Sequence, residues 1–132
     1  MAKAKKAKQL SFALSNRVGL LSKVSTALAD AKINMYAICA YGMGKQAYFM
    51  VVTDKNAQAK KALSTLKKKI ADEDVIAVEM PNRAGALRTV AQKIADAGVD
   101  IVYMYGTART GRSALCVFKT VDDKKAIKVI NK

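Results

Sequence analysis

The chain carries one segment twice, and this internal repeat limits the folds that it can adopt. Shifting the sequence by 66 positions places residues 16–31 on residues 82–97 with eight identities in 16 positions. The identical residues include the sequence Asn-Arg-x-Gly, which begins at Asn16 in the first copy and at Asn82 in the second. The chain has 132 residues, so each copy alone is too short to bury a large core. We therefore expect the two copies to pair.

The hydrophobic pattern predicts the same order of elements in both copies: strand, helix, strand, strand, helix. Apolar residues alternate over 10–14, as in a half-buried strand, and then recur at helical spacing at Leu21, Val24 and Leu28. Asn16 precedes this helix and is predicted to supply its N-cap side chain. The further predicted elements of the first copy are strands over 33–41 and 46–53 and a helix over 56–69; those of the second copy are strands over 75–80, 99–106 and 113–120 and helices over 85–97 and 122–130.

This order is a split βαβ arrangement and predicts a ferredoxin-like fold. The predicted fold class is α+β, with tandem ferredoxin-like repeats that pair into one antiparallel sheet with the helices on one face. A complete unit of this kind ends in a fourth strand, but only residues 71–74 separate the two copies, so we expect that strand to be truncated or missing. Its loss would leave the first strand as an exposed edge, which predicts a homodimer or a higher assembly. The predicted division is a basic disordered tail over 1–8, a first repeat over 9–74 and a second repeat over 75–132.

The composition excludes several classes of protein. An apolar fraction of 52% favours a packed globular protein, and the chain has no histidine, the usual general base and the commonest zinc ligand. No pair of carboxylates is placed for acid–base chemistry, so we expect neither enzymatic activity nor a cofactor or metal. Cys39 and Cys116 each lie in an apolar run, which indicates buried, reduced thiols. No apolar run reaches the roughly 18 residues of a membrane span and no secretory signal is present, so we expect no membrane partner and a cytoplasmic location.

The charge is strongly basic, with 24 Lys and Arg against 10 Asp and Glu and a formal net charge of +14. Such an excess attracts anionic partners, and the alternative function is a basic nucleic-acid-binding protein that uses a ferredoxin-like sheet. Many of the lysines lie in runs on predicted helices, where a charge run is usually the solvated face. The segment 45–52 is only partly similar to the RNA-binding strand motif, because Gln46 and Ala47 interrupt it.

Three features of the repeat resemble the ACT domain: the Asn-Arg-x-Gly-x-Leu turn, the short connection Lys-Ile-Asn-Met or Gly-Val-Asp-Ile after the helix, and the hairpin that follows. They match in the same register in both copies, over about residues 9–131. The resemblance implies a regulatory module that binds an amino acid or a related metabolite, at the strand-to-helix loops and the interface of the repeats. It also implies a free-standing tandem ACT protein whose regulated enzyme is a separate polypeptide.

In the serine-regulated members of the ACT family, an Asn in the loop and an Asn at the start of the second strand contact the effector. The resemblance places Asn16 and Asn34 at these positions in the first copy, and Asn82 and Asp100 in the second. Specificity for serine is not implied, because Leu14 stands where those members carry a His. The same is true of the second copy, which has Met80 there, and Val18 and Ala84 replace a proline that is frequent in the family.

The loop before each helix is also chemically suited to a ligand. Helix N-termini present unpaired N–H groups and partial positive charge, so a carboxylate docks readily. Gly19 and Gly85 permit close backbone approach, and amide side chains offer both donors and acceptors. Under the structural alternative, each Asn simply caps its helix, each Gly serves the backbone geometry, and Arg17 and Arg83 are solvated instead of clamping an anion. The predicted ligand-binding residues are Asn16, Arg17, Val18, Gly19, Leu20, Leu21, Asn34 and Met35 in the first copy, and Asn82, Arg83, Ala84, Gly85, Ala86, Leu87, Asp100 and Ile101 in the second.

Overall fold

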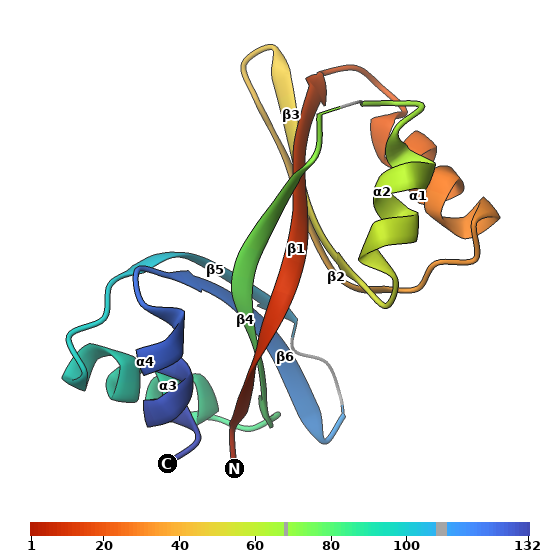
Figure 1. The fold of residues 1–132 in the computed structure, drawn as a ribbon. Coiled ribbons are helices and arrows are strands. Elements are labelled where there is room, and N and C mark those ends of the chain that lie inside the picture. Colours follow the sequence, from red (N-terminus) through yellow and green to blue (C-terminus); the bar gives the residue numbers. More distant parts are fainter. Residues whose placement is uncertain (68, 108–110) are drawn as a thin grey trace. The chain divides into compact units, whose positions relative to one another are not determined.

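A computed structural model describes residues 1–67, 69–107 and 111–132, which form two compact units (Figure 1). One unit comprises residues 8–73, and the other comprises residues 74–132 together with residues 1–7. The elements in chain order are β1 (Lys3–Ser15), α1 (Leu20–Asp30), β2 (Met35–Met43), β3 (Gln46–Thr53), α2 (Asn56–Leu63), β4 (Ala71–Pro81), α3 (Ala86–Asp96), β5 (Ile101–Thr107), β6 (Ser113–Thr120) and α4 (Asp123–Ile130). The strand order is β2-β3-β1-β4-β6-β5, which confirms the predicted α+β fold of ferredoxin-like repeats.

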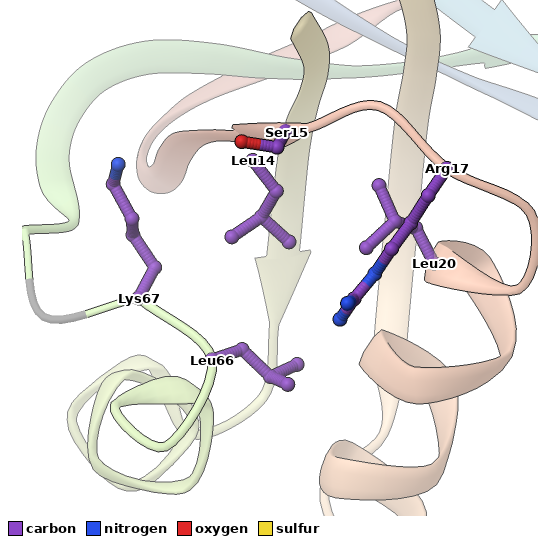
Figure 2. A pocket seen from close by; sticks show the side chains of 6 residues that line it. All are labelled: Leu14, Ser15, Arg17, Leu20, Leu66 and Lys67. Atoms are coloured by element: carbon purple, nitrogen blue, oxygen red, sulfur yellow. The ribbon is translucent and has the colours of Figure 1, made fainter.

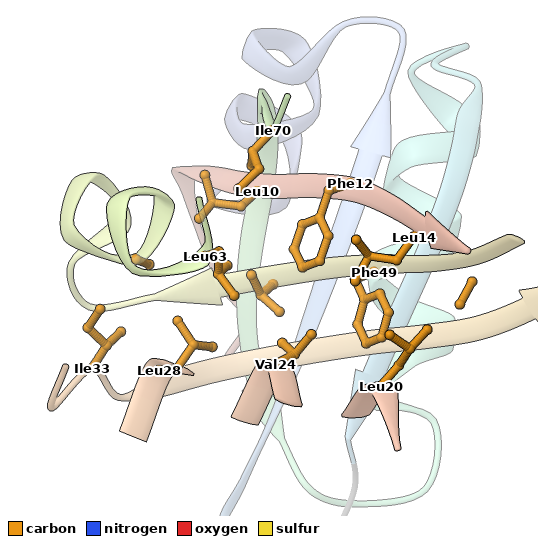
Figure 3. Close-up of a cluster of buried hydrophobic side chains, with 13 residues drawn as sticks. Leu10, Phe12, Leu14, Leu20, Val24, Leu28, Ile33, Phe49, Leu63 and Ile70 are labelled. Atoms are coloured by element: carbon orange, nitrogen blue, oxygen red, sulfur yellow. The ribbon is translucent and has the colours of Figure 1, made fainter. Parts of the chain in front are cut away.

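In the unit 8–73, two helices cover one face of the sheet. β3 pairs antiparallel with β1, with Leu10 opposite Val51, and on its other side with the edge strand β2. α1 and α2 pack on this sheet because their apolar residues recur at helical spacing, with Val24, Leu28 and Leu63 buried. Figure 3 shows these side chains meeting the inward residues of β1 and β3. At the centre of this core, the rings of Phe12 and Phe49 stack with their centroids 5.2 Å apart.

The unit formed by residues 1–7 and 74–132 repeats this plan. β6 pairs antiparallel with β4 and with the edge strand β5. α3 and α4 contribute Val90, Ile94, Ala126 and Ile130 to a core that also contains Phe118 of β6. Both units begin their second helix in the same way. The Thr53 hydroxyl donates to Oδ1 of Asn56 (2.6 Å), and the Thr120 hydroxyl donates to Oδ1 of Asp123 (2.6 Å).

Each repeat has three full strands, as predicted: only residues 71–73 form a strand after α2 in the unit 8–73, and residues 131–132, which follow α4, form none. The place of the fourth strand is taken instead by extensions of β4 and β1. In the unit 8–73, β1 lies between β3 and the first residues of β4. In the other unit, residues 3–7 of β1 take the place of the fourth strand beside β4, with Ala4 buried in the core. The Ala4 N–H donates to Oδ1 of Asn131 (2.7 Å), and Nδ2 of Asn131 donates to the Ala4 carbonyl (2.9 Å).

This arrangement differs from the disordered tail predicted over residues 1–8. Lys and Ala are poor strand formers, and the run of lysines suggested a solvated tail. The buried Ala4 between the exposed Lys3 and Lys5 is the inward position of a strand with period two. The first strand is therefore no exposed edge in the unit 8–73, and the argument for assembly that rested on such an edge does not hold. The edge strands are β2 and β5.

Candidate functional site

The two Asn-Arg-x-Gly loops have the same backbone conformation. Gly19 and Gly85 are the N-caps of α1 and α3, with φ angles of 93° and 86°. Neither Asn16 nor Asn82 is an N-cap, which corrects the prediction for Asn16, because each helix begins only after the glycine. A Cβ built on Gly19 would meet nothing within 4 Å. The left-handed conformation, and not close approach of a neighbour, is therefore what requires glycine here.

The asparagines of the loops contact the hairpins that follow. The Asn16 N–H donates to the Lys45 carbonyl (2.8 Å), and a Cβ on Gly42 would lie 3.0 Å from Nδ2 of Asn16. In the second repeat, the Asn82 N–H donates to the Arg112 carbonyl (3.0 Å), and its Nδ2 donates to the Gly111 carbonyl (3.1 Å). These contacts fasten the loop to the turn of the hairpin.

The structure does not bring Asn16 and Asn34 together within one unit. Ser15 lies opposite Gln46, at one end of β3, and Met35 lies opposite Thr53, at its other end. At about 3.3 Å per residue, the seven steps from Gln46 to Thr53 span about 23 Å. Asn34 instead contacts Asp54: its N–H donates to Oδ1 of Asp54 (3.0 Å), and the Asp54 N–H donates to its carbonyl (3.1 Å).

The second repeat separates its two predicted contacts in the same way. Pro81, next to Asn82, pairs with Ser113 at one end of β6, and Ile101, next to Asp100, pairs with Thr120 at the other end. A ligand held by the loop of one unit therefore cannot touch the start of the second strand of that same unit.

Most of the sixteen residues predicted to bind a ligand lie on the surface. In the first repeat, Leu20 is buried, Met35 is half-buried, and Asn16, Arg17, Val18, Gly19, Leu21 and Asn34 are exposed. In the second repeat, Asn82, Ala86 and Ile101 are half-buried, and Arg83, Ala84, Gly85, Leu87 and Asp100 are exposed.

A pocket of about 290 Å³ lies beside the first loop, between the end of β1, the start of α1 and the segment after α2 (Figure 2). Its walls combine apolar side chains, two cations and one hydroxyl group. In Figure 2 the side chains of Leu14 and Leu66 lie between Arg17 on one side and Lys67 on the other. The lining residues are Leu14, Ser15, Arg17, Leu20, Leu66 and Lys67.

The charge at this pocket is positive. The N-terminus of α1 has no side-chain cap and no acidic residue in its first turn, so the partial positive charge of the helix is uncompensated there. Arg17 and Lys67 add two full charges, and none of the six lining residues is acidic. The arrangement is suited to binding a small anion, with apolar surface alongside the charge.

Only Arg17 and Leu20 of the lining were among the residues predicted to bind a ligand. The sequence showed Leu14 and Leu66 as parts of apolar stripes and Lys67 as part of a charge run, so their convergence required the fold. Shifting by 66 positions replaces Ser15 by Pro81 and Leu20 by Ala86, and it places Met80 on Leu14. The second repeat therefore keeps the arginine of the loop and an apolar residue at the position of Leu14, but not Ser15 or Leu20.

Other chemically active groups are few in the described part of the chain. Both cysteines are free; Cys116 is buried, as predicted, and Cys39 is half-buried, which differs from the prediction. Burial raises the pKa of the Cys116 thiol and keeps it protonated. Among residues 1–67, 69–107 and 111–132, no group of three or more Cys, Asp or Glu could hold a metal ion. None of the helices formed by these residues is long and apolar enough to cross a membrane.

Comparisons with known proteins agree with this architecture. A family model described as "ACT domain pair" matches residues 5–132. A search of curated proteins finds no match. Among solved structures, a crystal structure of a protein from Bacteroides thetaiotaomicron has a TM-score of 0.86 at 32% sequence identity, with 97% of this chain and 88% of that chain covered.

Two regulatory subunits of aspartate kinase share the fold at lower identity. The subunit from Thermus thermophilus, in its ligand-free form, has a TM-score of 0.70 at 16% identity and covers 98% of this chain and 94% of its own. The subunit from Thermus flavus has a TM-score of 0.61 at 18% identity, with coverages of 99% and 94%. These likenesses concern the fold alone.

Proposed function

The chain belongs to the ACT domain family, as an ACT domain pair, and on this premise we propose that it is a regulatory module that binds an amino acid or a related small metabolite. The observation that carries the proposal is the pocket beside the first Asn-Arg-x-Gly loop. Its volume of about 290 Å³ suits a small metabolite, since pockets for larger drug-sized ligands range over roughly 300–1,000 Å³. Arg17, Lys67 and the uncapped start of α1 supply the charge that a carboxylate needs.

The regulated enzyme, under this proposal, is a separate polypeptide and the chain itself has no catalytic role. Support comes from solved structures of the same fold that are described as regulatory subunits of aspartate kinase. We further propose a cytoplasmic location, which is where a regulator of a metabolic enzyme would act.

We also propose that the protein works as a homodimer. Asn34 and Asp100 begin the second strands, about 23 Å of strand away from the loop of their own unit. They can contribute to an effector site only together with a loop from outside their own unit, and a second copy of the chain would supply such a loop. Sedimentation at micromolar concentration tests this part, and a monomer both with and without effector would contradict it.

A thermal-shift screen of the full chain tests the ligand-binding function. A molecule that binds only the native state raises the midpoint of unfolding. At a concentration of one hundred times its Kd, it raises the free energy of unfolding by about 2.7 kcal/mol. The screen should include the amino acids, their 2-oxo and 2-hydroxy acid analogues and the related dicarboxylates. We expect one or more of these to raise the midpoint.

The matched control compares the two repeats. Arg17→Gln removes the guanidinium that lines the pocket, and Arg83→Gln removes the equivalent, exposed guanidinium of the second loop. We expect the first variant to reduce the shift of a binding molecule and the second to leave it nearly unchanged. A set of compounds that produces no shift at all would refute the proposed function.

A further inference from the structure

The pocket beside the first loop has no carboxylate in its lining that could pair with a positively charged ligand. Its lining consists of three leucines, one serine, Arg17 and Lys67. No Asp or Glu occurs in the chain before Asp30, and the Glu73 carboxylate, which lies beside β1, accepts hydrogen bonds from the side chains of Ser11 and Gln9. Asp72, which follows α2, already forms an ion pair with Lys60 at 2.8 Å. An α-ammonium group placed in this pocket would face two cations with no acidic partner.

The same surroundings favour a carboxylate from three directions. Arg17 presents a planar fork of donors that matches a carboxylate, and Lys67 presents a mobile ammonium group. The first turn of α1 adds unpaired backbone N–H groups, since its first helical hydrogen bond runs from the Lys23 N–H to the Gly19 carbonyl. Lys67 is half-buried, so its charge is less screened by solvent than that of a fully exposed lysine.

The apolar part of the lining indicates what the carboxylate is attached to. Leu14 and Leu20 are 8% and 5% exposed, and Leu66 is half-buried. All three line the pocket, and Leu14 and Leu66 lie between the two cations in Figure 2. A short aliphatic chain would cover this surface, whereas a polar chain would lose hydrogen bonds to water there.

We propose that the ligand of this pocket is a short aliphatic carboxylate without an α-ammonium group, such as a branched 2-oxo acid, and not an α-amino acid. Arg17 holds the carboxylate, the leucines contact the aliphatic chain, and Lys67 adds a second positive charge to the pocket. This inference rests on the proposed ligand-binding function and narrows it to one chemical class. It also restricts the site to the first repeat, because Pro81 and Ala86 replace Ser15 and Leu20 of the lining in the second.

Titration calorimetry of the full chain with three matched compounds tests the inference. The compounds are 4-methyl-2-oxopentanoate, L-leucine and 3-methylbutylamine, which share the branched chain and differ in the charged end. We expect the oxo acid to bind about tenfold or more tightly than L-leucine, with one site per chain, and the amine to show no binding. Arg17→Gln and Lys67→Gln should each weaken oxo acid binding about tenfold, and Arg83→Gln should leave it within about twofold.

The possible failures are distinguishable. Binding of L-leucine as tight as that of the oxo acid, or binding of the oxo acid that survives Arg17→Gln, overturns the inference and leaves the proposed function standing. If the oxo acid does not bind but other members of the thermal-shift set do, the inference again fails alone. If no compound of either set binds, the proposed function fails with it.

Discussion

Asn131 fastens residues 3–7 to the second unit, and its removal should weaken that unit. Its side chain donates to the Ala4 carbonyl and accepts from the Ala4 N–H, at 2.9 and 2.7 Å. Each hydrogen bond of this kind stabilises a protein by about 0.5–1.5 kcal/mol, so Asn131→Ala should cost about 2 kcal/mol. For a chain of this size, a change of about 1 kcal/mol moves the midpoint of unfolding by about 3 to 4 °C. We therefore expect Asn131→Ala to lower the midpoint by about 7 °C.

Hydrogen exchange of the backbone amides locates this effect. In the wild-type chain, the amides of Lys5 and Ala7, which alternate with Ala4 along the strand and face β4, and the Ala4 amide, which donates to Asn131, should be protected. Asn131→Ala should speed exchange in this segment and leave the amides of β3 unchanged. Lys132→Ala, which changes the neighbouring exposed residue, is the matched control and should alter neither the midpoint nor the exchange.

Unprotected amides of Ala4, Lys5 and Ala7 in the wild-type chain would refute the strand and restore the disordered tail that the lysine run suggests. A stability of Asn131→Ala equal to that of the control would show that the two hydrogen bonds contribute nothing, even if the strand is formed. Both results are read from the same two variants.

Three further predictions concern glycines and thiols. Gly19→Ala should lower the free energy of unfolding by about 1 kcal/mol in chemical denaturation, because φ at Gly19 is 93°. Gly111→Ala is the control: a Cβ would meet nothing within 4 Å at either glycine, but φ at Gly111 is not positive, so this variant should keep the stability of the wild type. Gly106→Ala places a Cβ 2.6 Å from Sγ of Cys116 and should cost about 1–3 kcal/mol, and adding Cys116→Ala should restore part of that loss. Burial raises the pKa of the Cys116 thiol, so the stability that this thiol contributes is present at neutral pH and falls as the pH rises past 9.0, the ordinary pKa of a cysteine thiol. At pH 8, a thiol reagent should modify the half-buried Cys39 before the buried Cys116. Faster modification of Cys116 than of Cys39, or a stability that rises in alkali, would contradict this.

The repeat and the period of the apolar residues were sufficient to predict the fold, because both are local properties of the sequence. Val24 and Leu28 mark the buried face of α1 by their spacing, whereas Leu21, predicted on the same face, is exposed and Leu20 is buried in its place. The fourth strands were not predictable in this way. Residues 3–7 and 71–73 consist only of Lys, Asp, Glu and Ala, and they form strands because β1 and β4 extend beyond the segments that pair with β3 and β6. This long-range pairing overrides the weak strand propensity of Lys, Ala and Asp.

The candidate site shows the same division between local and long-range information. The left-handed glycines follow from the repeated Asn-Arg-x-Gly sequence, and Arg17 and Leu20 lie next to Gly19 in the chain. Leu66 and Lys67 are 46 or more residues away and reach the pocket only because α2 packs beside α1. Nothing in their sequence neighbourhood separates Lys67 from the other lysines of its run.

In the structure, Asn16 and Asn34 lie at opposite ends of the strands of their unit, although they are only 18 residues apart in the sequence. Two modes of binding follow from this separation, and the sequence spacing alone does not reveal them. The pocket lined by Arg17 and Lys67 lies within one unit, so a ligand there has an affinity that is independent of protein concentration. A ligand held by the loop of one copy and by Asn34 of another is linked to assembly, and its apparent affinity rises with protein concentration by mass action. Calorimetry at two protein concentrations, about tenfold apart, therefore assigns an effector to one mode or the other. Asn34 takes part only in the second mode. Asn34→Ala should therefore weaken only a ligand whose apparent affinity rises with protein concentration, and it should leave a ligand of the Arg17 pocket unaffected.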